Sequence, residues 1–440
     1  MTDTIPGLVL PRGLGEVDAA FMTRVLRNAG VIAETNEVVS QEEKGVGMTA
    51  GYFSEIKKVK CTYREPTAGP DSFVVKAWPA FEIMPKEGIK AMFMKDIKAY
   101  LFPAERFYPH PKAFLAAFDE AEDRWALVME DADSFAKHKV HETELTLDEV
   151  MKMLPGLVDV AVAWEGCHEG EKAAELAELG VDFWASEANL ALYKAVMPGG
   201  ARLFDKFTTL AGSSVVGSPT WDSYLGGPGI CEMFTRKIDA FFESAHPARG
   251  ATCTLSHGDL RGDNIFFCEA SGQYPGGWLC IDFQLLFRGP IPSDLAYLMS
   301  SGSVLPEVYA NENRQKIMRS FYDQFMAKTQ VYKDYTYEQF GREFEMMSTV
   351  LFVYYVGMGA AIWQQSASGE GQAARVELGP NGVTETDLTP EERRQRMWWG
   401  KALANFRENF KAFNHYEYLK GLPENLEGLG PWADLPAHLK

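Results

Sequence analysis

The sequence lacks the cysteine spacing, the basic charge and the leading segment that mark several common classes of protein. Its six cysteines, spread over 440 residues, include no CxxC pair, so we expect reduced thiols in a cytoplasmic protein. Lys and Arg number 43 against 61 Asp and Glu, a net charge of −18. This balance argues against nucleic acid and anionic membranes as partners, because both require basic surface. No basic region precedes an apolar core near the N-terminus, so no secretory signal is expected.

Long hydrophobic runs are also scarce, and one stretch alone raises the question of a membrane span. Met346–Trp363 contains eighteen residues without a charge. It includes polar and small residues, and no basic cluster lies beside it. We therefore predict a buried helix and no membrane span. Its aromatic residues are candidates for the wall of an apolar pocket: Phe352, Tyr354, Tyr355 and Trp363.

Two short motifs in the second half of the chain carry the chemistry. Ser256–Asn264 reads SHGDLRGDN and lies between the apolar runs Cys253–Leu255 and Ile265–Phe267. Cys280–Gln284 reads CIDFQ and follows a further apolar run. This pattern predicts a strand–loop–strand hairpin that gathers polar side chains.

The motif residues that matter chemically are Asp259, Asn264 and Asp282. Two carboxylates and an amide form a hard oxygen site of the kind that Mg²⁺ with phosphate prefers. One carboxylate remains to accept a proton from a hydroxyl. These are the elements that phosphoryl transfer requires.

The motifs also resemble those of a known superfamily. HGDxxxxN followed by IDF is similar to the aminoglycoside phosphotransferase and choline kinase superfamily. The finer spelling, HGDLxxxN, then DFQ, then GxPxxDL, looks most like its ecdysteroid-kinase-like branch. The resemblance implies an α+β, protein-kinase-like bilobal fold, with a small β-rich N-terminal lobe and a larger, mainly helical C-terminal lobe. It also implies ATP and Mg²⁺ as cofactors, Asp259 as the catalytic acceptor or orienter of a hydroxyl proton, and Asn264 and Asp282 as metal ligands.

A glycine-rich turn in the first third of the chain fits a phosphate-binding role. Gly45, Gly47 and Gly51 lie between two predicted strands, where backbone N–H groups can cover phosphates without side-chain interference. The strand Ser72–Trp78 follows and carries Lys76 between apolar neighbours. Lys76 resembles the kinase lysine that pairs with the α- and β-phosphates.

A helix predicted from about Lys86 to Phe102 is expected to supply the acid that pairs with Lys76. Asp96 occupies the position where the family usually has Glu, and Glu87 is the alternative. The shorter aspartate departs from the family pattern and leaves the choice between the two open.

Arg124–Asp131 predicts a strand that runs into a linker. The linker, from Met129 to Asp131, resembles the hinge whose backbone binds adenine. We therefore divide the chain into a nucleotide-binding lobe, 1–131, and a catalytic and substrate-binding lobe, 132–440. Thr146 and Glu149 form a capping box that opens a long helix. Asp294, in the GPIPSDLAYLM run, resembles an aspartate that braces the catalytic loop.

Three functions compete. The first is an ATP-dependent kinase for a fairly apolar small-molecule alcohol (sterol-like, terpenoid or aromatic), which the branch resemblance and the many aromatic residues favour. The second is a kinase for a cationic amino alcohol, choline- or aminoglycoside-like, which the acidic balance favours. The third is a nucleotide-binding pseudokinase, towards which only the aspartate at position 96 points. The segments expected to line the acceptor pocket carry no motif, so the sequence does not identify the acceptor.

Overall fold

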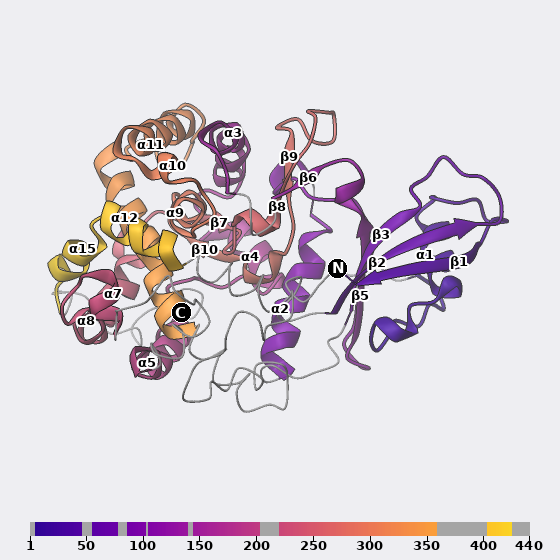
Figure 1. Cartoon of the computed structure of the whole chain (residues 1–440), viewed down its shortest axis with the longest axis horizontal. Helices are drawn as coiled ribbons and strands as arrows, with labels where there is room; N and C mark the ends of the chain where they lie inside the picture. Colours follow the sequence, from indigo (N-terminus) through magenta and orange to yellow (C-terminus); the bar gives the residue numbers. More distant parts are fainter. Residues whose placement is uncertain are drawn as a thin grey trace, which may run out of the picture. The chain divides into compact units, whose positions relative to one another are not determined.

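The computed structural model describes residues 5–45, 55–77, 86–102, 104–139, 144–202, 220–358 and 403–424. The chain forms two compact units. The first comprises Met1–His138 with Phe266–Leu285, and the second comprises Lys139–Ile265 with Leu286–Lys440. The structure thus joins Phe266–Leu285 to the first unit, whereas the division by sequence assigned it to the second lobe. The first unit is rich in strands and the second is mainly helical, as Figure 1 shows, which confirms the predicted α+β class.

The first unit is built on a five-stranded antiparallel sheet in the order β1-β2-β3-β5-β4. Lys76 lies near the middle of the sheet, opposite Ile56 on one neighbouring strand and Leu127 on the other. The backbone of this lysine is therefore fixed from both sides. The strands are β1 (Val38–Gly45), β2 (Glu55–Tyr63), β3 (Ser72–Ala77), β4 (Ala113–Asp119) and β5 (Arg124–Glu130).

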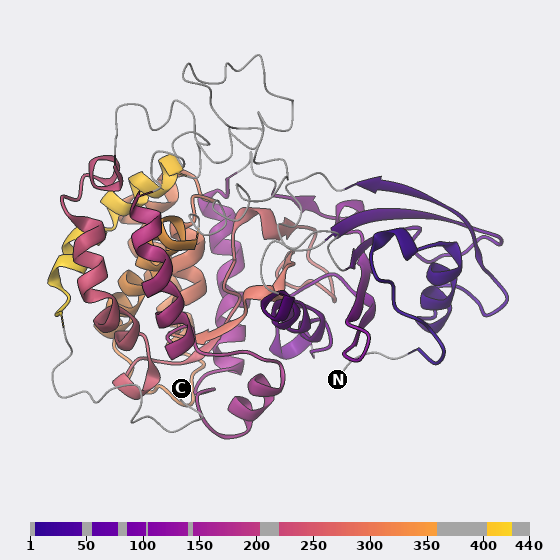
Figure 2. The same cartoon turned by 90° about the horizontal axis from the view of Figure 1, so that it is seen from below.

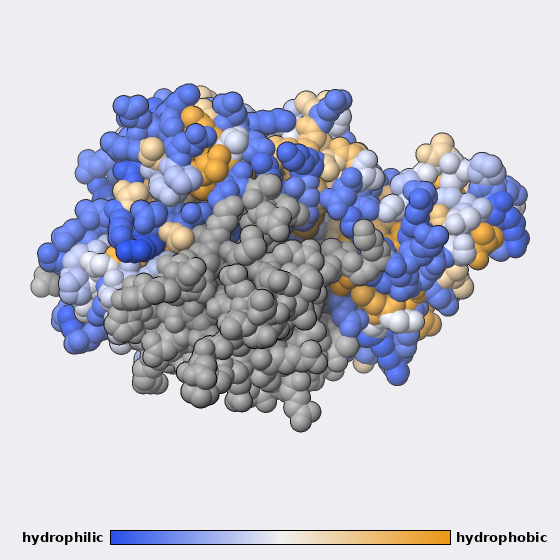
Figure 3. Space-filling model, viewed as in Figure 1, coloured by the Kyte–Doolittle hydropathy of each residue, from blue (hydrophilic) through white to orange (hydrophobic). Residues whose placement is uncertain are grey.

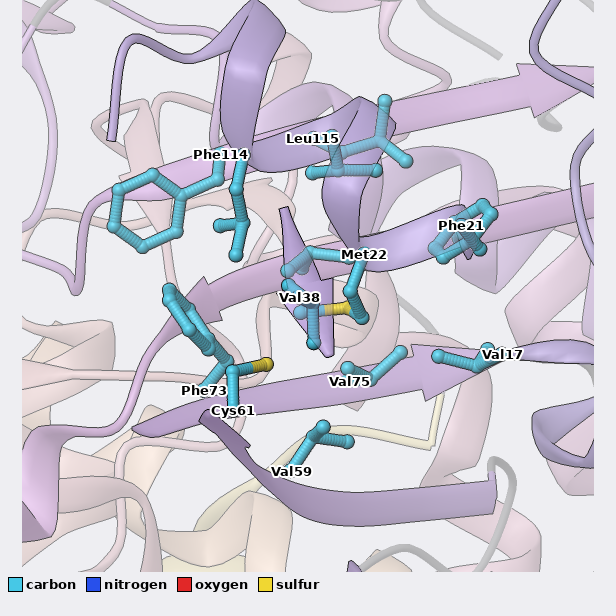
Figure 4. Packing of buried hydrophobic residues seen from close by; sticks show 14 of the residues in the cluster. Val17, Phe21, Met22, Val38, Val59, Cys61, Phe73, Val75, Phe114 and Leu115 are labelled. Carbon is cyan, nitrogen blue, oxygen red and sulfur yellow. The ribbon is translucent and has the colours of Figure 1, made fainter. Parts of the chain in front are cut away.

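One face of this sheet packs against α1 (Ala19–Asn28), as Figure 4 shows. Asp18 caps the helix by accepting a hydrogen bond of 2.8 Å from the Phe21 N–H. Apolar residues of the helix and of alternate sheet positions form a hydrophobic core. The burial of these side chains is the main contribution to the stability of this unit. Its labelled members are Val17, Phe21, Met22, Val38, Val59, Cys61, Phe73, Val75, Phe114 and Leu115.

The strands around the motifs pair differently from the predicted hairpin. In the second unit, β7 (Thr254–Ser256) pairs with β10 (Phe287–Gly289). In contrast, β8 (Ile265–Phe267) lies between β6 (Lys137–His138) and β9 (Trp278–Cys280) in a separate sheet. The predicted hairpin of β7 with β8 is therefore wrong. β7 instead satisfies its backbone groups with β10, a strand distant in sequence, whereas β8 pairs with the distant β6 and with β9, the next strand along the chain. The first unit is completed by α2 (Lys86–Ala99) and the short helices η1 (Leu14–Glu16), η2 (Ala104–Arg106), η3 (Ala132–Ser134) and η7 (Phe283–Leu285).

The second unit is a set of helices that pack side by side, as Figure 2 shows. Within it, α12 contacts α9, α11 contacts α3, and α5 contacts α8. The predicted capping box is confirmed, because Thr146 accepts from the Glu149 N–H while Glu149 accepts from the Thr146 N–H. The helices are α3 (Leu147–Ala163), α4 (Gly170–Glu178), α5 (Glu187–Arg202), α7 (Trp221–Leu225), α8 (Ile230–Ser244), η5 (Pro247–Arg249), η6 (Gly262–Asn264), α9 (Ser293–Ser300), α10 (Pro306–Tyr309), α11 (Asn311–Met326), α12 (Tyr337–Val353), the π-helical turn η8 (Tyr354–Met358) and α15 (His415–Gly421).

The uncharged stretch Met346–Trp363 divides between elements. Its first part completes α12, and Tyr354–Met358 forms η8. Trp363 lies outside the described residues. Within the part of the chain that the structure describes, no helix has the length and apolar composition needed to span a bilayer. On the face shown in Figure 3, hydrophilic side chains predominate over the coloured surface, and hydrophobic ones form small groups.

A buried histidine makes the second unit sensitive to acid. His415 is 1% exposed and lies 2.9 Å from the Thr349 hydroxyl, and burial lowers its pKa from 6.5 to about 3. The folded protein therefore keeps this imidazole neutral where the unfolded chain takes up a proton, so stability is lost as the pH falls below about 6.5. Between about pH 6.5 and pH 5 the loss through this group is about 2 kcal/mol. In urea unfolding at these two pH values, we expect His415→Asn to show a pH dependence smaller by about that amount. An unchanged dependence would contradict the assignment.

Candidate active site

Lys76 is the centre of a polar cluster in the first unit. Its ammonium nitrogen lies 3.1 Å from Asp96 Oδ2 and 3.1 Å from Asp282 Oδ1. Lys76 is 2% exposed and Asp96 is 1% exposed, so this ion pair is removed from water. Asp96 lies on α2, and the structure thus brings together the strand lysine, the helix aspartate and the CIDFQ aspartate. The side chain of the alternative acid, Glu87, lies outside the described residues.

The charges of this cluster support one another. Burial alone would lower the pKa of Lys76, but the carboxylates of Asp282 and Asp96 outweigh it and hold that pKa above its usual value. Burial raises the pKa of Asp96, and the contacts with Lys76 and the Phe283 N–H oppose that shift. An amine this buried stays charged only because the two carboxylates compensate for the loss of water. The cluster therefore holds a cation in a fixed position.

Asp282 differs from Asp96 in its access to solvent. Its side chain is 21% exposed, and its backbone has a φ of 74°, in the left-handed region that few residues other than glycine adopt. Its second oxygen, Oδ2, accepts a hydrogen bond of 3.3 Å from the Gln284 amide. The neighbouring Phe283 N–H donates to Asp96 Oδ1 at 2.9 Å. Asp96 therefore anchors both Lys76 and the backbone beside Asp282, a second role that the sequence did not reveal.

Removing the amine from this cluster is expected to destabilise the first unit. Lys76→Met keeps most of the side-chain volume but leaves Asp96 buried without its ionic partner. Breaking a buried ion pair in this way costs about 3–5 kcal/mol. Urea unfolding should show a loss of that size. The double variant Lys76→Met/Asp96→Leu, which removes both charges, should recover part of it. Equal stability of Lys76→Met and the wild type would contradict the buried pair.

Asp259 and Asn264 form a second polar cluster, in the second unit. The Asn264 side-chain nitrogen, Nδ2, donates to the Asp259 carbonyl oxygen at 2.8 Å and to Asp259 Oδ2 at 3.1 Å. Asp259 Oδ1 accepts from the Tyr297 hydroxyl at 2.7 Å, and Arg261 Nε lies 3.4 Å from the same oxygen. The five-residue spacing thus closes a turn in which the amide holds the carboxylate. Sequence reasoning missed Tyr297, because nothing in the motif indicates what the tyrosine contacts.

The loop that carries Asp259 is braced from α9. Asp294, at the start of that helix, accepts hydrogen bonds from the His257 N–H at 2.9 Å and the Gly258 N–H at 3.4 Å. Gly258 has a φ of 82°, a conformation that glycine adopts at low cost and other residues rarely do. This explains the glycine of the HGD motif. The contact predicted for Asp294 is therefore present. It fixes the backbone immediately before Asp259.

The residues predicted to bind the nucleotide are only partly within the described chain. Gly45 ends β1, whereas Gly47 and Gly51 lie outside the described residues. Met129 lies inside β5 with partner residues on both β3 and β4, so the linker begins only after Glu130. The Asp131 carboxylate accepts from Lys58 at 2.8 Å and Ser72 at 2.7 Å, which ties the start of that linker to the sheet.

Each polar cluster contains an oxygen donor of a type that Mg²⁺ accepts. Asn264 belongs to the second unit and Asp282 to the first. Both hydrogen bonds that the structure shows for the Asn264 side chain use Nδ2, which leaves the carbonyl oxygen Oδ1 for a cation. The Asp282 carboxylate is partly exposed in its own unit. Amide and carboxylate oxygens are ligands that Mg²⁺ prefers, so each residue taken singly has the chemistry to hold this ion.

Comparisons with known proteins agree with the resemblance. The model of the ecdysteroid kinase-like family matches residues 169–334, a stretch that contains Asp259, Asn264 and Asp282. The predicted resemblance to the ecdysteroid-kinase-like branch is therefore confirmed over that part of the chain. No curated protein matches the sequence.

Three solved structures show a distant likeness. A putative aminoglycoside phosphotransferase from Ralstonia eutropha is 14% identical, with 87% of this chain and 93% of that chain covered and a TM-score of 0.41. The GDP complex of wild-type aminoglycoside 2'-phosphotransferase IIIa is 14% identical, with 77% and 91% covered and a TM-score of 0.39. Aminoglycoside 3'-phosphotransferase of type VIII is 18% identical, with 70% and 92% covered and a TM-score of 0.36. These likenesses assign no role to any residue here.

Proposed function

We propose that the protein is an ATP-dependent small-molecule kinase that transfers the γ-phosphate to a hydroxyl of a fairly apolar alcohol. The observation that carries the proposal is the buried ammonium of Lys76 held between Asp96 and Asp282. A fixed cation beside a partly exposed carboxylate is the arrangement that positions a nucleotide triphosphate for transfer. The match to a kinase family over residues 169–334 supports the same reading.

In the proposed reaction Asp259 accepts a hydrogen bond from the acceptor hydroxyl and receives its proton. The hydroxyl oxygen forms a bond to the γ-phosphorus, and the bond from that phosphorus to the β–γ bridging oxygen breaks, so ADP leaves. Lys76 and the predicted glycine-rich turn, Gly45–Gly51, hold the phosphates of ATP. The linker after β5 holds its adenine. Bound through Asn264 and Asp282, Mg²⁺ would supply charge neutralisation at the phosphates. Alignment of these groups provides most of the rate, because a loose phosphoryl transition state needs little covalent help.

Aromatic residues close to Asp259 support an apolar acceptor. Tyr297, which contacts Asp259, has its ring 6.0 Å from that of Tyr354, and Tyr354 lies 6.2 Å from Tyr193. Tyr354 opens the π-helical turn η8, and such turns occur often at functional sites. A row of aromatic rings beside the proposed base suits a ring-bearing or terpenoid alcohol. The acidic charge balance of −18 favours the second candidate, a cationic amino alcohol, which aromatic faces also bind.

A test of the proposal measures ADP release from Mg-ATP by the full chain with two matched panels. One panel contains sterols, terpenoid alcohols and phenols, and the other contains choline and aminoglycosides. We expect turnover on the first panel. Turnover restricted to the cationic compounds would replace the apolar acceptor with the second candidate. Binding of Mg-ATP without turnover on either panel would identify a pseudokinase.

A further inference from the structure

The helix α9 touches the catalytic loop twice, one turn apart. Asp294 accepts hydrogen bonds from the His257 and Gly258 N–H groups, and Tyr297 donates to Asp259 Oδ1. Residues three apart on a helix lie on the same face, so one face of α9 holds both the loop backbone and the carboxylate that the loop carries. The first of these contacts holds the loop backbone, and the second reaches the proposed catalytic carboxylate itself.

The phenol of Tyr297 is suited to act as a permanent donor. Burial, and after it the charge of Asp259, raises the pKa of Tyr297 well above its usual value. The hydroxyl therefore keeps its proton at neutral pH and donates a hydrogen bond to the carboxylate. At 2.7 Å this is a short hydrogen bond to a charged acceptor, which is stronger than one between neutral groups.

Tyr297 shares the Asp259 carboxylate with other groups. Asn264 donates to Oδ2, and Arg261 Nε lies 3.4 Å from Oδ1 and 3.7 Å from Asp263, so its charge is shared. With donors on both oxygens, the carboxylate plane is fixed. The ring of Tyr297 also packs against Tyr354, which fixes the phenol in turn.

We propose that Tyr297 is a positioning residue of the reaction. Its hydroxyl holds Asp259 in the orientation that receives the acceptor. Its ring belongs to the row of aromatic rings, with Tyr354 and Tyr193, against which the acceptor packs. This inference rests on the proposed function for its catalytic part, while the contact itself is independent of any activity. An acceptor bound against the ring and a carboxylate bound to the hydroxyl would share one rigid side chain. Specificity for an apolar alcohol and alignment of the base would then depend on the same residue.

The test compares Tyr297→Phe with Tyr335→Phe in the full chain. Tyr335 is a matched control, because its hydroxyl also donates to a buried carboxylate, Glu343, at 2.6 Å in the same unit. Both variants lose one charged hydrogen bond and keep the ring. We expect Tyr297→Phe to lower kcat on the best alcohol of the panel about ten- to a hundredfold, with an unchanged KM for ATP. Tyr335→Phe should leave kcat unchanged. Equal effects of the two variants on kcat would overturn the inference.

A second measurement does not depend on turnover. Thermal unfolding of Tyr297→Phe, Asp259→Ala, which removes the acceptor oxygens, and the double variant forms a double-mutant cycle. If the hydroxyl contacts the carboxylate, the double variant loses less in Tm than the sum of the two single losses. The same cycle with Tyr335→Phe should be additive. Additive losses for Tyr297 would overturn this inference, whereas coupling together with no turnover on any acceptor would overturn the proposed function and leave the contact standing.

Discussion

Asp282→Asn is expected to lose nearly all phosphoryl transfer while the protein still folds and binds ATP weakly. The substitution keeps the size of the side chain, and Asn tolerates the left-handed backbone at this position, where φ is 74°. It removes the negative charge from the proposed metal ligand, although Lys76 keeps Asp96 as its partner. Several kcal/mol of transition-state stabilisation depend on such a metal, which corresponds to about a thousandfold or more in kcat.

The chain offers a close control for this variant. Asp123 also has a positive φ, 50°, and also pairs with a lysine, Lys90, at 2.9 Å in the same unit. Asp123→Asn therefore makes the same chemical change in a similar backbone outside the motifs. We expect steady-state kinetics to show wild-type turnover for this control. Retained turnover in Asp282→Asn would remove this residue from the proposed site.

Asp259→Asn is expected to lower kcat by about 10²–10⁴-fold, the contribution that a positioned general base makes. The amide has nearly the same shape and still accepts from Tyr297, but it no longer carries the charge that receives a proton. Isothermal titration should show nearly unchanged ATP binding, because the residue acts on the acceptor. The effect should therefore appear in kcat on the alcohol and not in the affinity for nucleotide.

Asp263→Asn is the matched control for this second variant, since it removes the same charge from the same loop. Asp263 lies 3.7 Å from Arg261, and we give it no part in the reaction. We expect turnover within a fewfold of the wild type. A similar loss in both variants would show that the loop responds to its total charge, and that Asp259 has no special role.

Local signals predicted the parts of the fold that local chemistry determines. The capping box of α3 and the strand that carries Lys76 both follow from short patterns, and the structure contains each of them. The contact of Asp294 with the loop followed from the family resemblance. These features depend on residues a few positions apart, or on a motif already known from other chains.

Features that depend on distant pairing were not predictable in this way. The alanine-rich strand β4 has no alternation of apolar and polar residues to reveal it, and it was missed. Val31 and Ile32 have the β-branched side chains typical of strands, but the structure has a bend there. The helical stretch that includes α15 is interrupted at Asn414, which adopts a φ of 56°.

The candidate site shows the same limit. The motif residues were identified by sequence, but the contacts of Asp96 with Phe283 and of Tyr297 with Asp259 join positions from separate elements. No spacing rule predicts them, because each depends on how a helix packs against a loop. Such contacts decide which carboxylate is buried and which remains reachable, and therefore which one can serve a ligand.

The most direct measurement follows the phosphate itself. The full chain is incubated with Mg-ATP that carries a heavy oxygen isotope on the γ-phosphate, together with the panel of apolar alcohols, and the products are examined by mass spectrometry. The account predicts a labelled phosphate monoester of one or more alcohols, formed by the wild type and almost absent with Asp282→Asn. Labelled inorganic phosphate alone, or equal ester formation by the variant, would contradict it.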